Sequence, residues 1–124
     1  MEIENKHNIP IDSLPGRGLA RVVGKNSYFA SEEMTVGYAF YDKRYGEMEP
    51  HHHAEETVII TKSVGGCVAW GPKKDNLSNV KKLEEGMILH IPAGEWHVFR
   101  YEPGGCIEII FIYAGTNNIR PEDK

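Results

Sequence analysis

The residues best suited to chemistry in this chain lie in PHHHAEET, residues 50–57. Three of the protein's six histidines stand in a row there, followed by Glu55 and Glu56. Side chains alternate between the two faces of a strand, so His51 and His53 are predicted to share one face, joined by Glu55 if the strand continues unbroken. Two imidazoles with this spacing provide about half of the ligands that a divalent ion requires. The pattern therefore predicts a metal site that is completed from elsewhere in the chain.

A second segment, GMILHIPAGEWH at residues 86–97, contains the histidine that we expect to complete the site. Pro92 fixes the exit from one predicted strand, Gly94 permits a tight reversal, and His97 opens the next strand. An antiparallel neighbour crossing beside residues 51–53 would bring His97 onto the same inner face. The two segments are therefore predicted to meet around one ion.

The other histidines have simpler interpretations. His52 is predicted to face solvent or to donate a hydrogen bond to a neighbour, His90 to be a satisfied core or rim residue, and His7 to lie in a polar arm. For His51 and His53 the competing hypothesis is a solvated, pH-sensitive loop, because an unperturbed imidazole titrates near pH ~6.5 without any metal. The histidine of the second segment favours the metal site over that loop.

The elements that must position these residues are predicted to be strands. Runs rich in β-branched and aromatic residues occupy 20–23, 33–42, 57–63, 67–70, 87–92, 97–101 and 106–115. Turn sequences rich in glycine and proline separate them, and no segment has a long helical period. This organisation predicts an all-β sandwich or closed barrel.

Two of the predicted strands differ in their apolar pattern. In residues 33–42 the large apolar side chains share one parity and small ones the other; the large set is Met34, Val36, Tyr38 and Phe40. The segment CIEIIFIYAG at 106–115 is apolar almost throughout, so it is predicted to be central and covered on both sides. Its one interruption, Glu108, is predicted to face outward because unpaired carboxylates are seldom fully buried.

Length and composition indicate one domain of ordinary globular character. The chain has 124 residues and a mass of 14.0 kDa, which allows a single core. We expect an N-terminal arm at 1–19, a barrel at 20–115 and a tail at 116–124. Cys67 and Cys106 are predicted to be reduced, structural thiols.

Charge and hydropathy argue against several classes of partner. The net charge is −4, and the lysine pairs at 73–74 and 81–82 are not interleaved with aromatic residues, so no nucleic acid is expected. No apolar run approaches the roughly 18 residues of a membrane span, and no membrane partner is expected. The polar opening MEIENKHNIP lacks the features of a secretion signal, which predicts a cytoplasmic protein.

The two histidine segments resemble the motifs of the cupins, which are small β-barrels with a metal pocket lined by two short motifs. The second motif matches through its histidine, with the spacing Gly86, five residues, Pro92, one residue, Gly94, two residues and His97. The first motif matches in part, at Gly46, His51, His53 and the pair Gly65 and Gly66. The resemblance spans residues 33–113 and implies a double-stranded β-helix, or jelly-roll barrel, of the small single-domain cupin-2 type. Tyr101 stands where the family usually has asparagine.

The acidic ligand of the first motif is out of place. Family members usually carry a glutamate four or five residues beyond the second histidine, where this chain has Thr57 or Val58. A bulge could turn Glu56 inward, Glu55 has the correct parity, or the protein ligands are histidines alone, with water.

A second register aligns the first motif differently. Glu49 then takes the place of the first histidine, His51 becomes the second, and Glu56 falls at the usual five-residue distance. Both registers keep His51 and His97 as ligands.

The resemblance implies a divalent ion, manganese, iron, nickel or zinc, held by His51, His53, Glu56 and His97. Open positions on the ion would bind a small oxygenated substrate, such as a sugar, a sugar acid or a hydroxy or keto acid. Lewis-acid chemistry, as in an isomerisation or a lyase reaction, is the leading hypothesis, with Glu56 and Tyr101 as candidate catalytic residues.

Three alternative functions are kept. A non-heme iron dioxygenase would suit an aromatic-walled pocket, a binding protein could capture a ligand through the metal without turnover, and a metal-free epimerase could use a histidine base. A homodimer is expected, because pairing across a two-fold axis protects exposed sheet edges.

Overall fold

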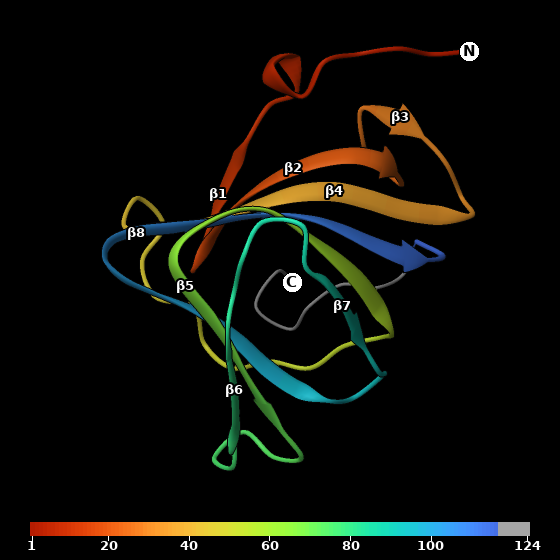
Figure 1. The fold of residues 1–124 in the computed structure, drawn as a ribbon. Helices are drawn as coiled ribbons and strands as arrows, with labels where there is room; N and C mark the ends of the chain where they lie inside the picture. The colour runs from red at the N-terminus through yellow and green to blue at the C-terminus, as the bar shows by residue number, and fades with distance from the viewer. Residues whose placement is uncertain (117–124) are drawn as a thin grey trace.

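The structure is a computed structural model that describes residues 1–116, and it is built almost entirely of β-strands (Figure 1). The elements are η1 (Lys6–Asn8), β1 (Asp12–Leu14), β2 (Arg17–Gly24), β3 (Phe29–Ala30), β4 (Met34–Tyr41), β5 (Glu56–Gly71), β6 (Asn79–Lys82), β7 (Ile88–Ile91) and β8 (Trp96–Ala114). The strands pair in the order β1-β2-β4-β8-β5-β6, with β3 added to β2 and β7 added to β5. The predicted all-β class is confirmed.

The two ends of the chain were expected to be irregular. Residues 1–19 contain η1, β1 and the start of β2, where Leu19 is already buried. The expected tail at 116–124 lies outside the described residues except for its first member. Within the described part, no helix is long and apolar enough to cross a membrane.

The strands β5 and β8 run from one layer of the barrel to the other (Figure 1). The first half of β5, from Thr57 to Ser63, pairs with the last part of β8, and its second half, from Gly66 to Gly71, pairs with the first part of β8. Register shifts lie between the two halves. Both strands therefore belong to both layers.

The sequence prediction divided each of these strands into two, at SVGG (63–66) and EPGG (102–105), and that division was wrong. The glycines bend the strands without ending them. At Gly66, an added Cβ would lie 2.4 Å from Cγ1 of Ile107, so the backbone approaches the facing strand more closely than any larger residue permits.

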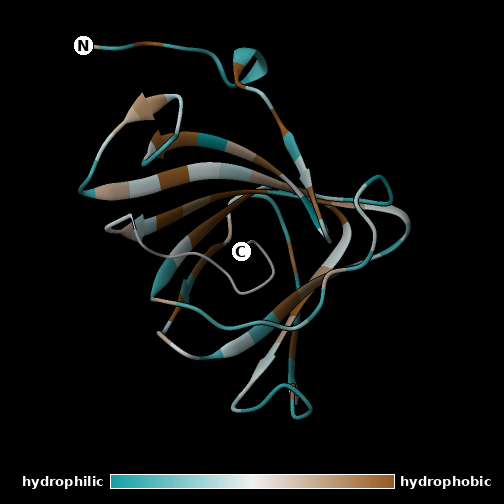
Figure 2. Cartoon of the chain, turned by 180° about the vertical axis from the view of Figure 1, so that it is seen from behind, coloured by the Kyte–Doolittle hydropathy of each residue, from teal (hydrophilic) through white to brown (hydrophobic). Residues whose placement is uncertain are grey.

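The core lies between the layers, and the loops around it are mostly hydrophilic (Figure 2). Its fully buried members come chiefly from β5 and β8 and include Val58, Ile60, Val98, Ile107 and Ile109. In β4 the residues that face this core are Gly37, Ala39 and Tyr41, and the ring of Phe111 leaves no room for a side chain at Gly37. The side chains of the other parity, Met34, Val36, Tyr38 and Phe40, face outward.

The strand β8 is central, as predicted, between β4 and β5. Its outer face is only partly covered, since Ile112 is 36% exposed, so the expectation of cover on both sides does not hold for the described chain. Glu108 faces outward as predicted, and Lys6 of η1 donates to it at 3.0 Å. Partial burial alone would raise the pKa of Glu108, but hydrogen bonds from Thr61 and Lys6 outweigh it and hold that pKa below its usual value.

Candidate metal centre

A short backbone clasp joins the two histidine segments. His51 and His97 form an antiparallel bridge, in which the N–H of His51 donates to the carbonyl of His97 at 3.1 Å and the N–H of His97 donates back at 2.9 Å. The turn before β8 adds a third bond, from the N–H of Gly94 to the carbonyl of His53 at 2.9 Å. Gly94 has φ 81°, the left-handed conformation that glycine adopts without strain. The crossing expected from the sequence is present.

The clasp brings three imidazoles together. The ring centroids of His51 and His97 lie 4.3 Å apart, those of His53 and His97 4.8 Å, and those of His51 and His53 5.2 Å. One ligand atom from each ring lies within 4.8 Å of the others, so this group could hold a metal ion. His51 and His97 are 6% and 1% exposed, respectively, so the ion would lie inside the barrel.

Backbone carbonyls orient all three rings. Nδ1 of His51, His53 and His97 lies 3.2, 2.8 and 2.9 Å from the carbonyl oxygens of Glu49, Ala54 and Glu95, respectively. A carbonyl only accepts, so each Nδ1 carries the proton and donates it, which leaves Nε2 as the basic nitrogen. Histidines that bind metals are commonly fixed by such a bond from the other ring nitrogen. The donor set therefore fits a divalent metal ion.

Glu56 is the carboxylate beside the histidines. It is 5% exposed, and its Oε1 lies 3.4 Å from Nε2 of His53 and 4.0 Å from Nε2 of His97. Glu55 lies outside, where its Oε2 is 2.5 Å from Nε2 of His90 on the rim. The side-chain alternation that favoured Glu55 fails because β5 begins only at Glu56, after a bend at Ala54.

Tyr113 is a neighbour of the site that sequence reasoning missed. Its hydroxyl lies 3.5 Å from Nε2 of His53, and the two rings meet edge to face at 5.3 Å. Tyr113 shares the inward parity of Ile109 and Phe111 on β8, and this parity is the pattern that could have identified it.

Tyr101, a candidate catalytic residue from the sequence, and His52, the neighbour of two predicted ligands, lie away from the three rings. The hydroxyl of Tyr101 donates to the carbonyl of Gly46 at 3.2 Å. Tyr101 is four residues along β8 from His97, roughly 13 Å of extended strand. Burial, followed by the charges of Asp42 and Glu47, raises its pKa.

His52 packs against the ring of Trp96, with centroids 4.5 Å apart, on the side opposite to its two neighbours. His52 is exposed, in agreement with the prediction that it faces solvent.

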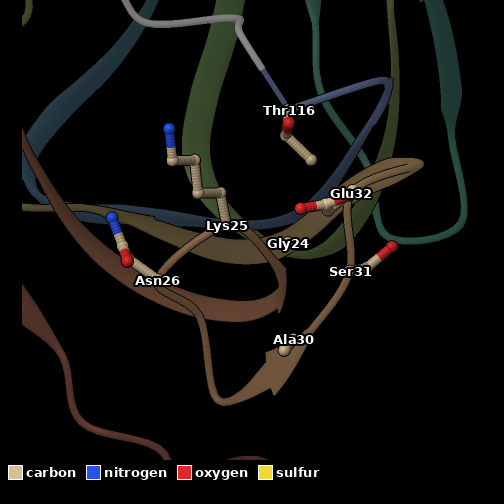
Figure 3. A pocket seen from close by; sticks show the side chains of 7 residues that line it. All are labelled: Gly24, Lys25, Asn26, Ala30, Ser31, Glu32 and Thr116. Atoms are coloured by element: carbon tan, nitrogen blue, oxygen red, sulfur yellow. The ribbon is translucent and has the colours of Figure 1, made fainter.

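Two of the pockets on the described chain bear on the site. One, of about 420 Å³, reaches His97 and has mainly apolar walls, including Trp70, Leu83, Met87, Leu89 and Ile91. The other, of about 430 Å³, lies at the end of β2 near Lys25, Glu32 and Thr116 (Figure 3). None of the described residues that line the second pocket is a histidine, so of these two the first is the one that reaches the candidate metal centre.

Comparison with known proteins gives the fold and no closer relationship. No family model matches the chain, and no curated protein has a sequence similar to it. Among solved structures, the polyketide cyclase RemF from Streptomyces resistomycificus superposes with a TM-score of 0.74 at 19% identity, covering 98% of this chain and 82% of that one.

Two further structures illustrate the range of activities on this fold. Oxalate decarboxylase from Bacillus subtilis, whose structure was studied for its Mn(II) centres, has a TM-score of 0.66 at 16% identity, covering 98% of this chain and 33% of that one. The DMSP lyase DddQ from Ruegeria pomeroyi has a TM-score of 0.64 at 13% identity, covering 98% of this chain and 61% of that one. These proteins have the cupin fold, so the fold predicted from the sequence resemblance is confirmed.

Proposed function

We propose that the chain is a metal-dependent cupin enzyme in which His51, His53, His97 and Glu56 hold a divalent ion. The observation that carries the proposal is the convergence of three buried or half-buried imidazoles, each fixed by a backbone carbonyl through Nδ1. Imidazole with one carboxylate suits manganese, iron, nickel and zinc. Four protein ligands leave room on a six-coordinate ion for a substrate that chelates through two oxygens.

The proposed substrate is a small oxygenated molecule, a hydroxy or keto acid or a sugar derivative, and the proposed reaction is an isomerisation or a lyase reaction. The ion, when bound, would supply Lewis-acid polarisation of a substrate oxygen. The hydroxyl of Tyr113 lies 3.5 Å from Nε2 of His53, beside the proposed ion, where it could donate a proton to a bound substrate, whereas Glu56 would act as a base only in place of its role as a ligand. The apolar walls beside His97 would exclude water. The cyclase, decarboxylase and lyase named above support small-molecule chemistry on this fold.

Metal content tests the proposal directly. The purified protein should bind about one equivalent of divalent ion, and His97→Ala should weaken binding by more than the roughly 10- to 100-fold lost when only a supporting partner of a ligand is removed. His52→Ala is the matched control, because His52 neighbours the ligands but packs against Trp96. Isothermal titration calorimetry and elemental analysis supply the readout. Equal metal binding by His97→Ala and His52→Ala would contradict the proposal.

A non-heme iron dioxygenase is the second candidate. It is favoured by the aromatic rings around the histidines, since Tyr113 packs against His53 and the ring of Phe99 lies 6.5 Å from that of His97. Oxygen uptake by the iron-loaded protein with substrate would distinguish this activity from Lewis-acid chemistry. A binding protein without turnover would show metal-dependent ligand affinity and no product.

The cellular compartment and the oligomeric state are also proposed. Cys67 and Cys106 are free thiols, which suits a reducing compartment such as the cytoplasm. A homodimer is proposed from the apolar outer face of β4, β8, β5 and β7, where Tyr38, Ile110, Ile59 and Ile88 lie in one register row across four strands.

A further inference from the structure

The pocket beside His97 is a slot between two parts of the barrel wall. The strand β7 pairs with the start of β5, from Glu56 to Ile59, whereas β6 pairs with its end, from Cys67 to Trp70. The segment that connects β6 to β7 contributes Leu83 and Met87 to the lining of the slot. It is anchored to β5 by hydrogen bonds from Leu83 to Gly66 and from Ile60 to Met87, both at 2.9 Å.

The walls of the slot suit an apolar body. Seven apolar side chains line it, together with His97. A polyhydroxylated sugar would require many hydrogen-bond partners here, whereas the lining is dominated by Trp70, Leu83, Met87, Leu89 and Ile91. An aromatic or alkyl ligand would instead remove apolar surface from water on both sides of the contact.

One lysine lies at the mouth of the slot. Lys81 pairs with Val68, whose side chain is 5% exposed and faces the interior, so Lys81 projects to the same side. Among the described residues that line the slot, Lys81 is the only lysine or arginine. Lys82, its neighbour, pairs with Cys67 and projects to the opposite face.

One carboxylate, that of Glu95, also lines the slot, on a different part of the chain from Lys81. Glu95 precedes β8, and β8 is separated from β6 by β5 in the sheet. The cation and the carboxylate therefore lie on different sides of the slot, with the apolar wall between them. A ligand acid group would be attracted to the β6 side.

We propose that the slot binds an amphipathic organic anion, with its apolar body against the Trp70 wall and its acid group at Lys81. This inference rests on the proposed function and narrows its substrate class, from sugars and small acids to acids with an aromatic or alkyl body. An oxygen at the far end of such a molecule would reach the side of His97. Lys81 acts as a specificity residue: its stem packs along the apolar wall and its ammonium group pairs with the acid.

A pair of fluorescent probes tests the inference. Anilinonaphthalene sulfonate has an apolar body and an acid group, and phenylnaphthylamine has the same ring system without the acid. Lys81→Met should raise the Kd for the sulfonate about fivefold, as expected for a charge-assisted contact near solvent, and leave the Kd for the neutral probe unchanged. Lys82→Met, the matched control, should change neither value.

A second variant tests whether the probes bind in the slot. Leu89→Ser, in the wall of the slot, should weaken both probes, and circular dichroism will verify that this variant is folded. Equal effects of Lys81→Met and Lys82→Met on the sulfonate, equal effects of Lys81→Met on the two probes, or undiminished binding by folded Leu89→Ser would each overturn the inference. Absence of sulfonate binding by the unmodified protein would also overturn it.

These titrations use metal-free protein, so they separate the two proposals. If the metal centre is wrong but the slot is right, probe binding follows Lys81 while His97→Ala leaves metal content unchanged. If the slot is wrong but the metal centre is right, the metal results hold and the probes do not distinguish the two lysines.

Discussion

Oε1 of Glu56, at 3.4 Å, and the hydroxyl of Tyr113, at 3.5 Å, are polar neighbours of Nε2 of His53. Glu56 and Tyr113 come from different strands, β5 and β8, and both are almost fully buried. With Nε2 of His53 and Glu56 as ligands of the proposed ion, the hydroxyl of Tyr113 lies beside that ion, where it could donate a proton to a bound substrate. For this reason we favour Tyr113 over Tyr101 as the tyrosine that moves protons.

Phenylalanine variants compare the two tyrosines. Tyr113→Phe should lower kcat about 100-fold, the lower end of the range for loss of a general acid or base, and should retain the metal. Tyr101→Phe loses only the hydrogen bond to Gly46 and should change kcat less than about threefold. The assay uses the metal-loaded protein and whichever hydroxy or keto acid proves to be turned over. A larger loss in Tyr101→Phe would restore the assignment made from the sequence.

The two carboxylates, Glu55 and Glu56, show which features of the site the local sequence could predict. The histidine spacing and the Gly86-to-His97 motif indicated the three rings, because those features depend on local chain geometry. Periodicity favoured Glu55 over Glu56, and that argument was wrong because a strand's alternation applies only where the strand is continuous. Where β5 begins is set by its pairing with Ile91 of β7, a contact 35 residues away that no local pattern specifies.

At the scale of elements, the bend of β5 at Gly66 sets the shape of the site. The first half of the strand carries Glu56, and the second half carries Trp70, which pairs with His97. A straight strand could not place the two ends in facing layers. The glycine pairs were interpreted as turns between strands, because local sequence does not distinguish a chain reversal from a bend within a strand.

Substitution of Gly66 tests this role. Gly66→Ala should lower the free energy of unfolding by about 2 kcal/mol, because the new Cβ would lie 2.4 Å from Cγ1 of Ile107 and 2.7 Å from Oγ of Ser63. Urea denaturation measures the change. In an Ile107→Ala background, which removes the nearest contact, the same substitution should cost less, and the double-mutant cycle isolates that coupling. Strictly additive effects would mean that Ile107 does not limit the approach of the strands.

At the scale of the whole molecule, the outer face of β4, β8, β5 and β7 is an apolar surface that is only partly covered. Ile88 is 70% exposed and continues the row of Ile59, Ile110 and Tyr38. A contiguous apolar surface of this kind is typical of a protein interface. Two copies that pack these faces together would also complete the cover that the sequence of β8 led us to expect.

Light scattering tests the dimer. The unmodified protein should have a mass of twice the 14.0 kDa chain, and Ile88→Glu should shift it towards a monomer at micromolar concentration. Val80→Glu is the matched control, because Val80 is also exposed, at 64%, but lies on β6 away from the proposed interface. A dimer unaffected by Ile88→Glu, or equally weakened by both variants, would exclude this face.

The clasp between His51 and His97 links metal binding to the resistance of the protein to proteolysis in a cell. It joins the segment before β5 to the start of β8, so an ion bound there would stabilise the same contact that holds these distant parts of the chain together. A ligand that binds only the native state lowers the fraction of unfolded chains by mass action. The concentration of the ion in the cell would thereby affect the rate of proteolysis of the protein as well as its activity.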